Sequence, residues 1–111
     1  MSFRFIRSIL FFDLHSVSKK DKKEYRDFIK LLKTLGFYSL QESVFCKMNI
    51  DKQAMDASLI KIKDKLPKDG NVMVLNVTEK QFSSMEIMLG ETNTDVVTSN
   101  DRIIDLWKKY L

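Results

Sequence analysis

The sequence has few of the residues on which many sites and scaffolds depend. It holds one cysteine, one histidine, one proline and three glycines among 111 residues. A single cysteine, Cys46, excludes an internal disulfide and favours a reducing compartment. One histidine leaves no His/Cys set with zinc-ligand spacing, and three scattered glycines leave no phosphate-cradling loop. These shortages argue against a zinc protein, a nucleotide-loop enzyme and a serine or cysteine triad.

Long apolar runs and targeting signals are missing as well. Arg4 and Arg7 interrupt the apolar residues at the N-terminus, so nothing there resembles a secretion signal. No segment has the length needed to cross a membrane. The chain length predicts one domain, residues 1–111, with a modest core. We therefore expect a cytoplasmic protein, whose net charge of +4 suits a polyanionic partner without requiring one.

What is present centres on residues 3–13. This stretch becomes continuously apolar at residues 9–12, which predicts a central strand buried on both faces, and it stops on one carboxylate, Asp13. Aspartate is a poor strand former, and its charge is costly to bury. Asp13 is therefore the candidate catalytic and metal-binding residue. The alternative is that Asp13 caps the following loop or pairs with a nearby lysine.

The next segment predicts a helix that starts with a group of cations. Ser18 is placed as its N-cap with Asp21 as capping-box partner, and Gly36 ends it as a left-handed cap. Backbone N–H groups at a helix N-terminus favour anions, so the cations are candidates for binding nucleic acid. The alternative is a solvated charged face. We call this group the basic cluster; its members are Lys19, Lys20, Lys22, Lys23 and Arg26.

The middle of the chain predicts strands around a second helix. Residues 37–48 are extended, and Gln41–Glu42 divides them without a turn residue, so a hairpin and one bent strand both fit. Cys46 lies on one face of this segment and is interpreted as a buried, inert thiol. The second helix starts after Asn49 or Asp51 and is stopped by Pro67. Its buried stripe is Met55, Leu59, Ile62 and Leu66.

The last part of the chain predicts two more strands and an apolar tail. Residues 72–77 are wholly apolar apart from Asn76, which indicates a second central strand. Residues 78–82 form a connector, and residues 85–89 alternate as a half-buried strand. The tail is too apolar to be a frayed end. The candidate dimer or partner edge is formed by Met85, Ile87, Leu89, Ile103, Ile104 and Trp107.

The order of elements predicts an α+β, ferredoxin-like β-α-β-β-α-β fold, an antiparallel sheet with both helices on one face. The extra strand near residue 85 would extend the edge of a sheet. This edge could be that of the sheet in a second copy of the molecule. In such a dimer two Asp13 carboxylates would meet, and they repel unless a proton or cation lies between them. Mg²⁺ that keeps most of its waters suits such a pair. Beside a basic groove it would activate water against a phosphodiester.

Three blocks of sequence resemble the small CRISPR-associated family called Cas-two. They are residues 9–13 (Ile-Leu-Phe-Phe-Asp), residues 36–37 with 41–45, and residues 76–82 (Asn-Val-Thr-Glu-Lys-Gln-Phe). The last block, continued through residues 88–90, is similar to versions from type II (Cas9-type) systems. The resemblance implies a ferredoxin-like homodimer in which the last strand of one subunit joins the sheet of the other. It also implies metal binding at Asp13 and phosphate contacts near the start of the first helix.

The same resemblance implies a role in spacer acquisition. The family works in complex with a larger integrase subunit, and its members are described as metal-dependent endonucleases, chiefly on single-stranded RNA. Here the dimer would hold two integrase halves apart and grip duplex DNA backbone, a sequence-independent and salt-sensitive contact. Two other functions stay open: a stand-alone Mg²⁺-dependent endoribonuclease and a ferredoxin-like module that binds a small ligand. His15 departs from similar sequences, which often have proline there.

Overall fold

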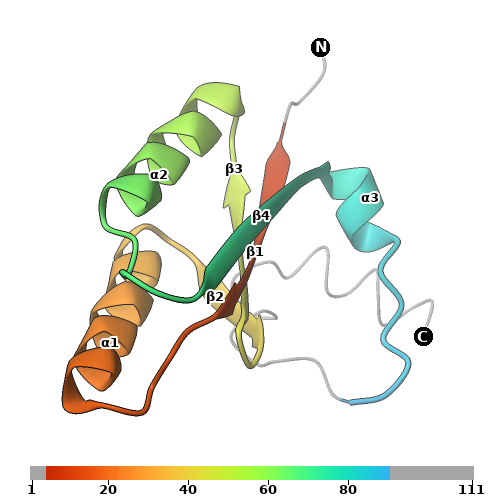
Figure 1. Cartoon of the computed structure of the whole chain (residues 1–111). Coiled ribbons are helices and arrows are strands. Elements are labelled where there is room, and N and C mark those ends of the chain that lie inside the picture. The colour runs from red at the N-terminus through yellow and green to blue at the C-terminus, as the bar shows by residue number, and fades with distance from the viewer. Residues whose placement is uncertain (1–4, 91–111) are drawn as a thin grey trace.

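The computed structural model describes residues 5–90 of the chain. Its elements are β1 (Ile6–Asp13), α1 (Lys19–Thr34), β2 (Tyr38–Gln41), β3 (Val44–Asn49), α2 (Lys52–Asp64), β4 (Asn71–Thr78) and α3 (Glu79–Ser83). The strands form one antiparallel sheet in the order β2-β3-β1-β4. Figure 1 shows α1 and α2 on one face of this sheet and α3 on the other. The predicted ferredoxin-like plan is confirmed.

The main core lies between the sheet and the helices α1 and α2. β1 is central, as predicted, and sends Leu10 and Phe12 into this layer. Phe12 meets Phe28 of α1 edge-on, with ring centroids 5.8 Å apart, a favourable aromatic geometry. The buried members of this cluster are Leu10, Phe12, Phe28, Leu32, Phe37, Phe45 and Ile62.

The predicted signals for the start and end of the first helix are confirmed. The Ser18 hydroxyl accepts a hydrogen bond from the Asp21 backbone N–H at 3.0 Å, and the Asp21 carboxylate accepts one from the Ser18 N–H at 3.3 Å. Gly36 has φ +100°, where a side chain would be strained. The second helix is capped by Asp51, whose carboxylate accepts from Ala54 N–H at 2.8 Å.

The second helix ends earlier than predicted. It stops at Asp64, and Lys65 already has a non-helical backbone. Leu66 therefore lies outside the helix, with its side chain exposed, and is no part of the buried stripe. The physical reason is Pro67, which disfavours helical geometry at the residue before it as well as at itself.

Residues 37–48 contain a hairpin, which settles the choice that the sequence left open. β2 pairs with β3 in antiparallel register, and the connection turns at Ser43. Ser43 has φ +65°, an uncommon conformation for a residue other than glycine. The turn contains no glycine or asparagine, the residues from which a hairpin turn is usually recognised in a sequence.

Three predictions for the later part of the chain are wrong. β4 pairs only with β1 among the described strands, so residues 72–77 form an edge strand and not a central one. Residues 79–83, expected as part of a connector, form α3 behind a Thr78 capping box. Residues 85–89 form no strand. Their alternation is real, but a strand also needs a neighbour for its backbone, and no ladder forms with them.

Within residues 5–90, no helix combines the length and apolarity that crossing a bilayer requires.

Candidate functional site

Asp13 is the last residue of β1 and lies opposite Asn71, the first residue of β4. Its side chain is exposed, so no burial penalty acts on its charge. Within residues 5–90, no hydrogen bond or ion pair to the Asp13 carboxylate is found, so the alternative of a capping acid or a lysine partner gains no support there. By strand alternation Asp13 belongs to the same face of the sheet as Phe11, the face opposite α1 and α2.

The donor set around Asp13 fits magnesium only in a limited way. Among the described residues there is no group of three or more His, Cys, Asp or Glu side chains that could hold a metal ion. A single exposed carboxylate matches the way Mg²⁺ is often bound, through one or two carboxylates plus substrate phosphates, with water completing the shell. One protomer therefore offers a hard oxygen ligand and leaves the remaining ligands to water, substrate or a second copy.

The basic cluster lies in the first turns of α1, and the structure leaves all five of its cations exposed. Only Lys23 has an ion-pair partner among them, Asp27 one turn on, at 3.0 Å. The loop of residues 14–18 joins the cluster directly to Asp13, so both lie at the same end of the molecule (Figure 1). Only the short loop separates the acid from the cations along the chain, and the roles of both in binding and catalysis stay predictions.

A cleft extends the cationic surface beyond the cluster. It has a volume of about 700 Å³ and lies between α1 and residues 65–68. Its lysines are Lys20, Lys30, Lys65 and Lys68, and Glu24 and Asp27 lie among them. Sequence analysis missed Lys65 and Lys68, because they are far from the cluster in the chain and only the packing of α2 brings them near it.

The partner-edge role of residues 85–89 stays a prediction, although these residues form no strand. Met85 and Leu89 are exposed in irregular backbone, and Ile87 packs against the cluster of Ile9, Cys46 and Phe82. Ile87 thus contributes to the protein's own core. Ile103, Ile104 and Trp107 lie outside the described residues.

A different apolar surface, missed from the sequence, lies on the face of β1 and β4 opposite the helices. Phe11 pairs with Met73, and Leu75 is the next residue on the same face. Their side chains are 37%, 65% and 53% exposed, respectively. We call these three residues the β1–β4 strip. Neighbouring exposed apolar side chains of this kind mark interaction surfaces in proteins.

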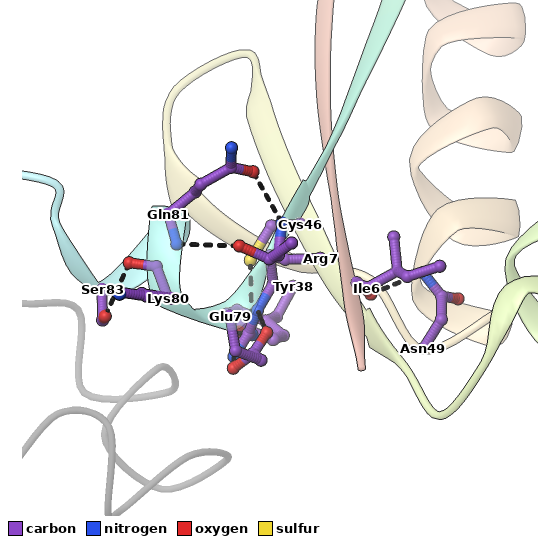
Figure 2. Close-up of polar contacts among 10 residues, drawn as sticks. Ile6, Arg7, Tyr38, Cys46, Asn49, Glu79, Lys80, Gln81 and Ser83 are labelled. Atoms are coloured by element: carbon purple, nitrogen blue, oxygen red, sulfur yellow. Dashed lines mark hydrogen bonds and ion pairs between the residues drawn. The ribbon is translucent and has the colours of Figure 1, made fainter. Parts of the chain in front are cut away.

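The same face also holds a buried arginine, which the sequence suggested only as an interruption of the apolar run. Arg7 is fully buried, and its guanidinium donates two hydrogen bonds to Glu79 of α3, both at 2.8 Å. It also donates to the Tyr38 hydroxyl and lies 4.2 Å from the centre of the Phe82 ring. Figure 2 shows Arg7, Tyr38, Cys46 and Glu79 gathered beneath α3.

The electrostatics of this group favour a structural role. Burial is the largest single influence on Arg7 and lowers its pKa. The hydrogen bond to Glu79 and the electrostatic interactions with Tyr38, Cys46 and Glu79 together outweigh burial, so the pKa of Arg7 is raised. Burial also raises the pKa values of Tyr38 and of the Cys46 thiol. A buried thiol that keeps its proton is a poor nucleophile, so the prediction of an inert Cys46 agrees with this environment. We call Arg7, Tyr38, Cys46, Glu79 and Phe82 the Arg7 cluster.

Comparisons with known proteins give one consistent result. Residues 6–85 match the family model described as CRISPR associated protein Cas2. The chain is 36% identical over 105 residues to a CRISPR-associated endoribonuclease Cas2 from Streptococcus mutans serotype c, covering 95% of this chain and 96% of that protein. It is 36% identical over 101 residues to a protein of the same name from Treponema denticola, covering 91% and 100%. A solved structure titled "Crystal structure of cas2" superposes with a TM-score of 0.60 at 20% identity, covering 81% of this chain and 92% of that one.

Proposed function

Because the chain belongs to the CRISPR associated protein Cas2 family, we propose that it is a nucleic-acid-binding homodimer with metal-dependent endoribonuclease activity. Its cellular role is the acquisition of CRISPR spacers in the cytoplasm, together with a larger integrase subunit. Curated relatives named as endoribonucleases support the activity. The observation that supports the proposal is that Asp13 ends the strand that carries Phe11 of the β1–β4 strip, and that residues 14–18 join Asp13 directly to the basic cluster.

The β1–β4 strip supports the proposed homodimer. Two copies that pack this strip against each other would remove Phe11, Met73 and Leu75 from water, at about 25 cal/mol per Å² of apolar surface. β4 also has a free edge among the described strands, and a strand from the partner would satisfy its backbone groups. Pairing of identical patches about a twofold axis is the commonest geometry of homodimers. Asp13 lies on the same face of the sheet as the strip. Packing the strips of two copies together would therefore bring the two Asp13 carboxylates toward each other.

In the proposed reaction the protein's own residues bind and orient RNA. The basic cluster holds the phosphate backbone by charge, and the two Asp13 carboxylates face the scissile phosphodiester. Mg²⁺, when bound by these carboxylates, supplies an activated water and charge stabilisation at the phosphate. Asp13 is the residue that holds the ion, and the remaining ligand positions belong to water and substrate.

Replacing Asp13 by asparagine tests the activity. Asp13→Asn keeps the size of the side chain but removes the negative charge, so cleavage of single-stranded RNA in Mg²⁺ should fall by about 100-fold or more, the range seen when an electrostatic group at a reaction centre is removed. Asp64→Asn, at an exposed acid of α2, is the control and should cleave at the normal rate. Undiminished cleavage by Asp13→Asn would contradict the catalytic role. Loss of both cleavage and spacer integration would refute a purely structural role.

Nucleic-acid binding is tested by neutralising the lysines of the basic cluster. A quadruple variant with Lys19, Lys20, Lys22 and Lys23 changed to glutamine should bind duplex DNA more weakly. The slope of log K against log salt should shrink by about 0.9 for each phosphate contact that is lost. The comparison is a variant with Lys52, Lys61, Lys63 and Lys80 changed to glutamine. Each set contains one lysine in an i,i+4 ion pair, with Asp27 or Asp56, so the two sets are matched in charge and pairing.

Equal slopes for the two quadruple variants would show that binding depends on total charge and not on the cluster. The absence of any nucleic-acid affinity at low salt would favour the third function, a ferredoxin-like module for a small ligand. Dimer formation, measured by sedimentation, should be the same in both variants, because neither set includes a residue of the β1–β4 strip.

A further inference from the structure

The backbone of Gly70 lies close to the strand end that carries Asp13. A Cβ atom built on Gly70 would lie 2.7 Å from the Asp13 carbonyl oxygen, 3.0 Å from a Leu14 methyl carbon and 3.1 Å from the Leu14 Cα. Two of these three atoms are backbone, which cannot rotate away as the end of a flexible side chain can. Gly70 also has φ +112°, outside the range that other residues prefer.

The neighbours of Gly70 cannot easily move apart. The next residue, Asn71, pairs with Asp13 as the last pair of the β1–β4 ladder. This pairing holds the turn that contains Gly70 against the end of β1. On the other side, Leu14 packs against the main core, which resists displacement of the strand end in that direction. Asp13 and Leu14 are thus held between the core and the backbone of Gly70.

From this packing we infer that Gly70 is a positioning residue for Asp13: the missing side chain lets the turn clamp the strand end in the place that the proposed activity needs. The inference rests on the proposed role of Asp13. Restoring an ordinary contact of 3.4 Å at the Asp13 oxygen would require a shift of about 0.7 Å. Functional groups have to be held within about 0.5 Å of their productive geometry, and a misplacement of about 1 Å costs on the order of 100-fold in rate.

The chain contains a matched control for this substitution. Gly90 has the same φ of +112°, but a Cβ built on it meets nothing within 4 Å. Gly70→Ala and Gly90→Ala therefore introduce the same side chain at the same φ. They differ in whether that side chain presses on the strand that ends at Asp13.

The experiment compares full-length Gly70→Ala and Gly90→Ala in two measurements. In RNA cleavage with Mg²⁺, Gly70→Ala should lower kcat by about 10- to 100-fold with the KM for RNA unchanged within about twofold, because RNA is held by the basic cluster and not by this turn. In NMR spectra without substrate, it should shift the amide signals of Asp13 and Leu14. The Mn²⁺ concentration that broadens these signals should rise at least about threefold, because a displaced carboxylate binds the ion less well. Gly90→Ala should match the unsubstituted protein in each.

Equal behaviour of the two variants would overturn the inference, since it would mean that the exposed turn absorbs the shift. If Gly70→Ala does not fold, Gly70→Asn and Gly90→Asn replace the pair, because asparagine tolerates a positive φ better than alanine and still carries the Cβ atom. Asp13→Asn separates the two hypotheses. If it cleaves RNA normally, the proposed function fails, and displacement of the strand end is then judged from the amide signals alone.

Discussion

The two halves of the sheet face opposite α1 and α2 contain similar residues but differ in how those residues are covered. Over β2, β3 and the start of β1, the Arg7 cluster and Ile87 bury Ile9. Over the end of β1 and the edge strand β4, the β1–β4 strip is left in contact with solvent. Both halves have apolar side chains, but the first also contains the charged pair of Arg7 and Glu79. The difference lies in α3, whose Phe82 packs against Ile9 and Cys46 of the first half.

This comparison indicates two kinds of surface. The first half is covered by the chain itself. There the buried guanidinium of Arg7 donates hydrogen bonds to Glu79 of α3 and to Tyr38. The second half has the composition of an interface but has no covering element among residues 5–90. A face covered by the chain itself should respond to mutation through folding, and a face covered by a partner should respond through association.

The largest effect is expected in the covered half. Glu79→Ala leaves the buried Arg7 charge without its carboxylate, and breaking a buried pair in this way costs about 3–5 kcal/mol in the free energy of unfolding. Because the Glu79 side chain is 21% exposed, water can partly replace it, and we expect about 3 kcal/mol, the lower end of that range. Urea unfolding measures the loss. Glu86→Ala, at an exposed acid three residues beyond α3, should cost at most about 0.5 kcal/mol. Similar losses in both variants would mean that Arg7 does not depend on Glu79.

A comparable effect, but on association, is expected in the open half. Met73→Asp places a charge in the β1–β4 strip, which in the proposed dimer would be buried against its own copy. We expect the dimer to dissociate about 100-fold more readily, the equivalent of about 2.8 kcal/mol. Sedimentation equilibrium measures this. The unfolding free energy of the monomer should change by less than about 0.5 kcal/mol, because Met73 is already largely exposed.

Met88→Asp provides the matched control for that experiment. Met88 is 87% exposed and lies in irregular backbone outside the strip, so the same substitution there should leave association unchanged. Equal weakening by both variants would place the interface elsewhere. No change with Met73→Asp would remove the main support for pairing through this face.

The smallest effect concerns the reactivity of Cys46. Burial raises the pKa of its thiol, so less thiolate is present at any pH in the ordinary thiol range. Alkylation of the folded protein by iodoacetamide at pH 8 should be at least about 10-fold slower than after unfolding in urea. Mass spectrometry of the labelled chain follows both rates. Equal rates would mean that α3 moves away from the sheet often enough to expose Cys46 in the folded protein.

Local signals predicted the two long helices, α1 and α2, and most of their boundaries. The Ser18 capping box, the left-handed Gly36 and the Asp51 cap act through neighbours within a few residues, so they are visible in sequence. The end of α2 was missed by two residues, because proline acts on the residue before it as well. The hairpin at Ser43 could not be chosen, since its positive φ is held by strand pairing and not by a turn residue.

The candidate site was predictable in part for the same reason. Asp13 and the basic cluster are separated by a short loop, so the sequence alone placed an acid beside cations. Gly70 and two residues of the β1–β4 strip, Met73 and Leu75, come from a turn and a strand more than fifty residues farther along the chain. Nothing in the apolar run of residues 72–77 distinguishes an edge strand from a central one, because both contain the same residue types.

The sequence by itself determined the two long helices and the strands around them, and hence the ferredoxin-like plan, because periodicity and capping depend on contacts within a few residues. It also determined that one acid ends the first strand next to a cationic helix. Only the tertiary structure decided which strand lies at the edge, where α3 rests and what Arg7 binds. Those features depend on contacts between residues up to 72 positions apart, and such pairings follow from the packing of the whole sheet and not from any local pattern.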